Sequence, residues 1–193
     1  MDIPQSWKDL LQRVQQQCPS AVLAGGALRD LDHGVPPKDL DIFIEVGDID
    51  EALVLCEKLG GVTPENDDLD EDDNKVYPAS MAEVKLVADY DHEKNKLGVD
   101  VNLPVQFIFV DWRTHSIVER FDYGICRIAY NGREIIEGSG YESDKMNKTM
   151  TIFRCKSEMA LSSSVMRFAR LKQKYPDHRW CWQGNLIKVV GED

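Results

Sequence analysis

Two short motifs, separated by a loop, constrain this chain of 193 residues more than any other part of it. The first, residues 23–30, is an apolar run that reaches the pair Gly25 and Gly26 and continues into Arg29 and Asp30. Glycine accepts tight backbone angles that a Cβ would forbid, so a glycine pair after a strand can bring backbone N–H groups close to an anion. The first motif therefore predicts a phosphate-binding turn, to which Arg29 adds a fixed positive charge.

The second motif, residues 38–44, places Asp39 and Asp41 two positions apart in a run of strand-forming residues. Alternate residues of a strand lie on the same face, so both carboxylates are expected to project together. Carboxylate oxygens are ligands that Mg²⁺ prefers, and bound Mg²⁺ serves phosphoryl and nucleotidyl transfer. The motif predicts that Asp39 and Asp41 hold Mg²⁺, or Mn²⁺ in its place. Taken singly, a glycine pair is most often a turn and Asp-x-Asp a solvated strand end, and only their combination is specific.

Together, residues 25–30 and 36–42 resemble the head-domain signature of the polymerase-beta-type nucleotidyltransferases. The resemblance is closest to the branch that contains the CCA-adding tRNA nucleotidyltransferases and the bacterial poly(A) polymerases. It implies that the triphosphate is held by Gly25 and Gly26, that Mg²⁺ is bound by Asp39 and Asp41, and that the nucleotide pocket is shaped by Arg29 and Asp30. We also assign Lys38, beside Asp39, to the nucleotide site.

A later segment, residues 167–170, resembles the arginine-phenylalanine-alanine segment that follows the head domain in CCA-adding enzymes and lies near the nucleotide. It places Arg167 and Arg170 among the nucleotide-binding residues. The charge distribution agrees with an anionic ligand there. Residues 1–111 carry 9 basic and 24 acidic side chains, whereas residues 112–193 carry 14 basic and 10 acidic ones. An ordinary solvated basic helix would give the same charge pattern.

The hydrophobic pattern predicts a series of helices and strands along the chain. Helices are expected over residues 6–17, with Ser6 as N-cap, and over 27–31, 49–59, 116–121 and 157–174. Strands are expected over residues 22–24, 40–46, 84–90, 105–110 and 123–130, the last closed by an Asn131–Gly132 turn. This order indicates the α/β (α+β) class, with a small mixed sheet and helices mainly on one face. We expect a head domain over residues 1–138 and a basic C-terminal helix and cap over 139–193.

The resemblance also implies a third catalytic carboxylate on a neighbouring strand, but the expected position falls on or beside Gln106. An amide ligates Mg²⁺ poorly and cannot act as a base. The sequence offers Asp122, Asp111, Asp89 and Asp91 as substitutes. We assign the role to Asp122, because it starts a predicted strand that would lie beside the site.

Two functions follow from these features. In the first, the protein is a Mg²⁺-dependent nucleotidyltransferase that moves a nucleoside monophosphate from an NTP such as ATP to a hydroxyl of RNA, a protein or a small molecule. In the second, the site is degenerate and binds nucleotide, RNA or a protein partner without turnover. Retention of Asp39 and Asp41 favours the first function, and Gln106 favours the second. A chain of this length has no room for the helices with which CCA-adding enzymes grip tRNA, so faithful tRNA repair is not expected.

Composition indicates the compartment. Five cysteines, an odd number with no Cys-x-x-Cys pair, argue against a disulfide framework or a zinc site. No signal peptide or membrane-crossing apolar run is evident, so a soluble cytoplasmic protein without membrane partners is expected. Acidic residues crowd positions 65–73, and their mutual repulsion predicts a mobile loop that nucleotide binding does not require.

Overall fold

The computed structural model describes residues 1–63, 84–154 and 158–182, and the acidic stretch at positions 65–73 lies outside these ranges. The helices are α1 (Gln5–Gln15), α2 (Gly26–Asp32), α3 (Ile49–Leu59), α4 (Tyr141–Asn147) and α5 (Glu158–Lys174), with 3₁₀ helices η2 (Thr114–Arg120) and η3 (Gly124–Cys126). The strands are β1 (Val22–Ala24), β2 (Leu40–Glu45), β3 (Gly61–Val62), β4 (Val84–Tyr90), β5 (Val105–Val110), β6 (Ile128–Tyr130), β7 (Ile135–Glu137), β8 (Thr149–Ile152) and β9 (Arg179–Trp182). None of the described helices is long and apolar enough to cross a membrane.

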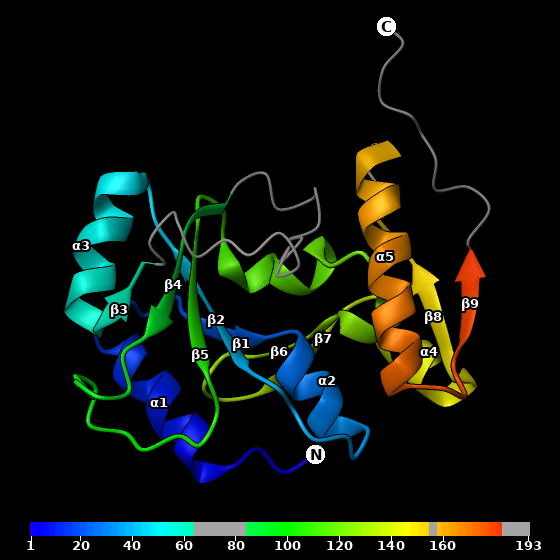
Figure 1. Ribbon diagram of the computed structural model, residues 1–193, viewed down its shortest axis with the longest axis horizontal. Helices are drawn as coiled ribbons and strands as arrows, with labels where there is room; N and C mark the ends of the chain where they lie inside the picture. The colour runs from blue at the N-terminus through cyan, green and yellow to red at the C-terminus, as the bar shows by residue number, and fades with distance from the viewer. Residues whose placement is uncertain (64–83, 155–157, 183–193) are drawn as a thin grey trace, which may run out of the picture.

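A seven-stranded mixed sheet with the order β3-β4-β5-β2-β1-β6-β7 forms the centre of the protein (Figure 1). Its central pair, β2 and β5, is parallel, and the other pairs are antiparallel. Side chains on both faces of this pair are buried, apart from Asp41 and Glu45 of β2, which are partly exposed. The predicted α/β class and mixed sheet are confirmed, and near the start of the parallel pair Asp41 is left partly exposed beside the buried Gln106.

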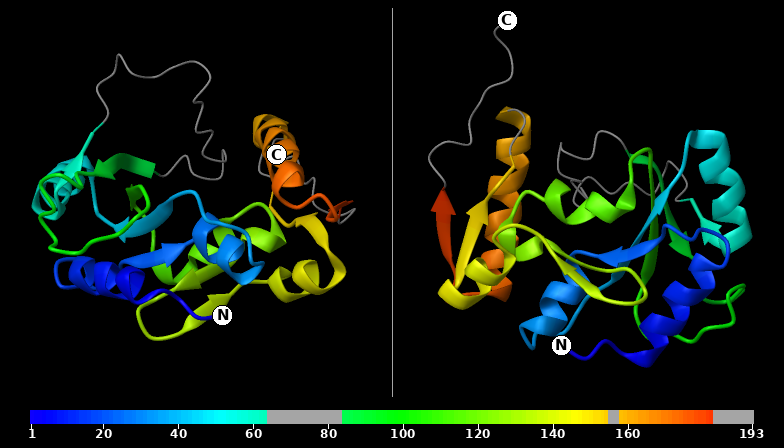
Figure 2. Two further views of the ribbon diagram at one scale, coloured as in Figure 1. Left: turned by 60° about the horizontal axis from the view of Figure 1, so that its bottom comes forward. Right: turned by 180° about the vertical axis from the view of Figure 1, so that it is seen from behind.

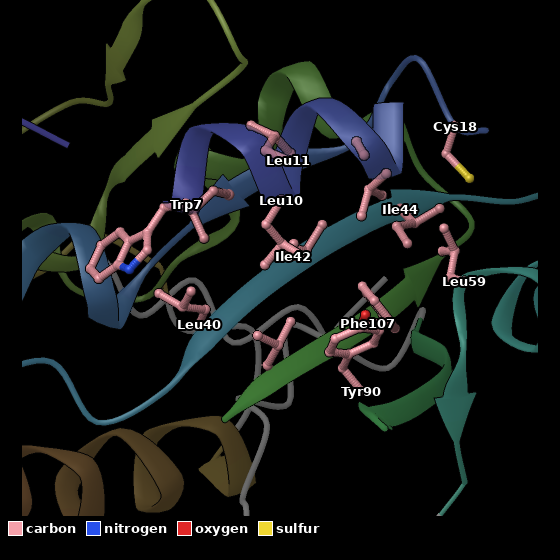
Figure 3. Packing of buried hydrophobic residues seen from close by; sticks show 14 of the residues in the cluster. Trp7, Leu10, Leu11, Cys18, Leu40, Ile42, Ile44, Leu59, Tyr90 and Phe107 are labelled. Carbon is pink, nitrogen blue, oxygen red and sulfur yellow. The ribbon is translucent and has the colours of Figure 1, made fainter. Parts of the chain in front are cut away.

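One face of the sheet is covered by α1 and α3, and Figure 3 shows Trp7, Leu10 and Leu11 of α1 over Ile42 and Ile44 of β2. Apolar residues of α1 recur with helical spacing, and their burial gives the helix its stability. The expected N-cap at Ser6 is wrong, because the helix begins one residue earlier and Pro4 takes the cap position without a side-chain hydrogen bond.

The other face of the sheet carries a second apolar cluster, which includes Phe43, Ile108 and Phe121 and extends to Leu171 of α5 and to Tyr175 directly after this helix. Residues of β2 with odd numbers and residues of β5 with even numbers lie on this face. Helix α5 therefore packs against the same face from which residues 39, 41 and 106 project.

Beyond the sheet, β8 and β9 form a parallel pair connected through α5, and Figure 2 shows this unit beside one end of the sheet. The buried carboxylate of Asp144 connects β8 with η3. It accepts hydrogen bonds from the backbone N–H of Ile125 and Thr151 and from the hydroxyls of Thr149 and Thr151. The division of the chain after residue 138 stays a prediction.

The predicted strand over residues 123–130 is mostly wrong. Only Ile128–Tyr130 is strand, and Gly124–Cys126 forms the 3₁₀ helix η3. The Ile125 N–H donates to Asp144 instead of to a neighbouring strand. A Cβ on Gly124 would lie 2.6 Å from Oδ2 of Asp144, so this close approach requires glycine. The predicted strands at 84–90 and 105–110 and the helix at 49–59 have the expected bounds.

Candidate active site

The turn at Gly25 and Gly26 lies where the chain leaves β1 and enters α2. Gly25 has a φ of +85°, in a region that residues with a Cβ rarely adopt. A Cβ built on Gly25 would lie 3.5 Å from Cζ of Phe121 and 4.0 Å from Oδ2 of Asp41. The turn therefore faces the Asp41 carboxylate at close range, and a side chain at position 25 would narrow the space between them.

Three polar side chains form a row across strands β2, β5 and β4. Asp41 pairs with Gln106, and Gln106 pairs with Asp89. Paired residues on adjacent strands project from the same face of the sheet. Nε2 of Gln106 donates a hydrogen bond of 2.6 Å to Oδ1 of Asp89. The amide thus occupies the expected place of the third carboxylate, and the next strand brings a carboxylate against it.

Two hollows with Lys38 as a common wall lie along this row. The larger has a volume of about 550 Å³ and is lined on the sheet side by Gly25, Gly26 and Asp41. The smaller, of about 250 Å³, is lined by Asp39, Asp89 and Gln106. The two predicted metal ligands therefore open onto different hollows, with Asp41 beside the glycine turn and Asp39 beside Gln106.

Helix α5 forms the opposite wall of the larger hollow. Arg167, Arg170 and Lys174 line it, and these residues follow one another at intervals of three and four. Such spacing places side chains on one side of a helix. The basic side of α5 therefore faces the Gly25 turn, and the structure brings residues from both ends of the chain into one hollow.

No protein-family model matches the chain, and no curated protein matches it. Solved structures match it over most of its length. The Thermotoga maritima CCA-adding enzyme in complex with tRNA has a TM-score of 0.59 and 17% identity, over 91% of this chain and 38% of that one. A CCA-adding enzyme in complex with ATP gives a TM-score of 0.56 and 17% identity, over 88% of this chain and 38% of that one. The chain has the nucleotidyltransferase fold.

A tRNA nucleotidyltransferase in complex with a primer tRNA and an incoming ATP analogue also matches, with a TM-score of 0.53 and 15% identity over 89% of this chain and 46% of that one. The resemblance drawn from the two motifs is confirmed at the level of the fold, that of the head domain of these enzymes. The chain spans less than half the length of the structures it matches.

Within this nucleotidyltransferase fold, Asp30 does not line the larger hollow but lies behind two residues that do. It is 1% exposed and forms a buried ion pair of 2.7 Å with Nη2 of Arg29. Lys174 and the Tyr175 hydroxyl also donate hydrogen bonds to the Asp30 carboxylate. Asp30 therefore joins α2 to α5 and orients two cations that line the hollow, Arg29 and Lys174.

Electrostatics keep Arg29 charged inside the protein. Burial opposes its charge, but Cys126, Asp30 and Tyr175 more than offset this effect and raise the pKa of Arg29 above its ordinary value. Burial also raises the pKa of the Cys126 thiol and of the Tyr175 hydroxyl. The larger hollow is thus lined by a permanent cation, Arg29, beside the neutral thiol of Cys126, and the neutral phenol of Tyr175 donates to Asp30 behind it.

The structure places Asp122 in the interior, 1% exposed, against the middle of α5. Its carboxylate accepts hydrogen bonds of 2.7 Å from the Ser164 hydroxyl, 3.0 Å from Nη1 of Arg167 and 3.0 Å from the Tyr123 N–H. It does not begin a strand, because η3 follows it. These contacts give Asp122 an anchoring position next to Arg167, and its predicted role as a catalytic carboxylate stays a prediction.

Metal binding would draw on few protein ligands. Among the residues that the structure describes, no three His, Cys, Asp or Glu side chains form a metal-binding group by themselves. Mg²⁺ commonly takes one or two carboxylates from a protein and completes its shell with substrate phosphates and water. The hard oxygen donors Asp41, beside the open hollow with the glycine turn, and Asp39, beside the adjoining hollow, fit an ion that binds together with a nucleotide.

Sequence reasoning missed Lys174 and the pairing of Gln106 with Asp89. The basic side chains spaced along residues 167–174 are a signal that could have added Lys174 to the predicted pocket. Asp89 was only one of several substitute acids, because the sequence alone does not fix which residue of β4 pairs with Gln106.

The described cysteines, Cys18, Cys56, Cys126 and Cys181, are free thiols.

Proposed function

We propose that the protein is a Mg²⁺-dependent nucleotidyltransferase, which transfers a nucleoside monophosphate from an NTP to a hydroxyl and releases pyrophosphate. The observation that carries the proposal is the larger hollow, in which the Gly25 turn, the Asp41 carboxylate and the basic side of α5 face one another. A hollow of about 550 Å³ lies within the range of small-molecule sites.

The charges that line this hollow suit a triphosphate. Arg29, Lys38, Arg167, Arg170 and Lys174 contribute positive charge, and Asp41 is the carboxylate among the described lining residues. Fixed cations in a partly enclosed site stabilise the negative charge that develops on a departing pyrophosphate. The excess of positive charge therefore supports a ligand that carries several negative charges, with its metal ion held near Asp41.

Each group then has a role in the transfer. The Gly25–Gly26 turn leaves room for the phosphate chain, and the cations of α5 orient it and neutralise the leaving group. Asp39 and Asp41 would hold Mg²⁺, which supplies charge neutralisation at the phosphate oxygens. Asp30 keeps Arg29 and Lys174 in place from behind.

The acceptor is a hydroxyl, and RNA is the acceptor class we favour over a protein or a small molecule. The support is the set of matched structures, whose subjects include CCA-adding enzymes bound to tRNA and to ATP. The smaller hollow, which is open beside Asp39, offers space for an acceptor next to the nucleotide.

A second function, nucleotide binding without turnover, is favoured by one observation. Gln106 stands where a carboxylate would complete the metal site, and its amide is 6% exposed and committed to Asp89. In that case the hollow would bind NTP and release no pyrophosphate.

The test is a transfer assay with each α-³²P-labelled NTP, Mg²⁺ and RNA, protein or small-molecule acceptors, in which both label transfer and pyrophosphate are measured. Pyrophosphate release that depends on Mg²⁺ and is lost in Asp41→Asn supports the enzyme. NTP binding without pyrophosphate under every condition supports the binding module. Absence of NTP binding would refute both functions.

A further inference from the structure

We propose that Asp89 on β4 is the carboxylate that accepts the proton of the attacking hydroxyl, in place of the acid that position 106 lacks. The inference deepens the proposed function and rests on it. It moves the base one strand outward along the row of Asp41, Gln106 and Asp89.

The first support is geometric. Asp89 projects from the same face of the sheet as Asp41, because both are aligned with Gln106. The bond of 2.6 Å from Nε2 of Gln106 fixes one oxygen of Asp89. Gln106 therefore becomes a positioning residue for Asp89 and is no longer a missing catalytic group.

The second support is the smaller hollow. Asp89 and Asp39 line it together, and Lys38 connects it with the nucleotide hollow. An acceptor hydroxyl that entered this space would lie between the nucleotide side and the Asp89 carboxylate. The side chain of Asp89 is exposed, so its second oxygen is accessible from this hollow.

The competing acids are placed less favourably. Asp122 is buried and accepts three hydrogen bonds. Asp111 follows the end of β5 and forms an ion pair of 2.7 Å with Lys85. Asp91 accepts hydrogen bonds from the backbone of the following turn and pairs with Lys94. Among these described acids, Asp89 alone joins the row and lines a hollow that adjoins the nucleotide.

The acceptor oxygen forms a bond to the α-phosphorus of the NTP, and the bond from that phosphorus to the bridging oxygen breaks. Pyrophosphate leaves with the electron pair, and the hydroxyl proton passes to Asp89 and then to water. Aspartate accepts a substrate hydroxyl proton in other phosphoryl-transfer sites.

The experiment compares Asp89→Asn with the matched control Glu93→Gln, which changes an exposed acid on the loop that follows β4. Asparagine keeps the shape and can still accept the Gln106 hydrogen bond. We expect kcat for transfer to fall about 100-fold or more in Asp89→Asn. The Kd for a non-hydrolysable NTP with Mg²⁺, measured by calorimetry, should be unchanged, as should the melting temperature. Glu93→Gln should resemble the wild type in all three measurements.

A swap of the two residues sharpens the result. Gln106→Asp alone should lower the transfer rate, since it places two carboxylates side by side. The double variant Gln106→Asp with Asp89→Asn should be more active than Asp89→Asn alone, because it restores one carboxylate to the row. Wild-type kcat in Asp89→Asn, or a Gln106→Asp variant more active than the wild type, would overturn the inference and leave the proposed function intact. A wild-type protein that binds NTP but never releases pyrophosphate would overturn both.

Discussion

The two walls of the nucleotide hollow are built in different ways. On the sheet side, Asp41 lies at the start of β2 and lines this hollow. Asp39 directly precedes the strand and lines the adjoining hollow. On the helix side, Arg167 and Lys174 are long, flexible cations that reach the hollow from α5. Each of them is held by a carboxylate that is 1% exposed, Asp122 for Arg167 and Asp30 for Lys174.

The difference shows where fold stability and ligand binding coincide. We expect that the carboxylates Asp39 and Asp41 can be replaced with little effect on the core, because both are only partly buried. A buried carboxylate that neutralises cations cannot, since its removal leaves uncompensated charge in the interior. Mutations on the two walls should therefore separate into those that change chemistry and those that change folding as well.

The largest effect is expected from Asp30→Asn. The variant leaves Arg29 and Lys174 without their counter-charge, and we expect the free energy of unfolding to fall by about 3 kcal/mol or more. Urea denaturation measures it. The control is Asp177→Asn, which removes a carboxylate that is 76% exposed, pairs with Lys148 at 3.6 Å and should matter little. Equal stability of the two variants would contradict the view that the helix side is held from the interior.

The next effect concerns the sheet side. Asp41→Asn should reduce nucleotidyl transfer by about 100-fold or more, because it removes a charge that the reaction uses. Its melting temperature should stay at the wild-type value or rise. A large loss of stability, measured by thermal denaturation, would show that the strand end is not independent of the core.

Asp122→Asn tests the anchor of Arg167 and should have an intermediate effect. We expect weaker NTP binding by about tenfold, since one hydrogen-bonded cation of the hollow loses its charged partner. The comparison is Arg167→Gln, and the double variant should be little weaker than either single variant if the two residues act through one contact. If Asp122→Asn abolished transfer and left NTP affinity intact, Asp122 would be a catalytic carboxylate as the sequence predicts.

The smallest effect concerns the contact between the residues that directly follow α2 and those that follow α5, where the rings of His33 and His178 lie 5.7 Å apart. Burial lowers the pKa of both histidines. The charge of Lys145 also lowers the pKa of His33, and that of Lys148 the pKa of His178, whereas Asp32 and Asp144 act in the opposite direction on His33 and His178 respectively. Below pH 6.5 the unfolded chain then binds protons that the folded protein does not, so stability is lost as the pH falls.

We therefore expect the melting temperature to drop between pH 7.5 and pH 5.5, and to drop less in His178→Gln. The exposed His92 supplies the control, and His92→Gln should keep the wild-type pH dependence. An unchanged pH dependence in His178→Gln would mean that this histidine does not report on the docking of α5.

The fold was predictable wherever a segment's own pattern matched its environment. The helix over residues 49–59 and the strands at 84–90 and 105–110 have apolar spacing that tertiary contacts did not override. Segments stabilised by buried polar groups were not predictable. Strand β8 contains Thr149 and Thr151, and the sequence alone suggests that such polar residues lie at the surface. In the structure both are buried, because their hydroxyls donate hydrogen bonds to Asp144.

By itself, the sequence determined the sheet side of the site. The glycine turn and the Asp39–Asp41 pair lie within 17 consecutive residues, and strand periodicity together with the freedom of glycine sets their relation. Only the tertiary structure decided the rest. The contact of Lys174 with Asp30 joins residues 144 positions apart, and that of Gln106 with Asp89 depends on the register of β4 against β5. Such long-range packing and register follow from the burial of whole elements. Local spacing can indicate the basic side chains of residues 167–174, but it does not encode which carboxylate each of them contacts.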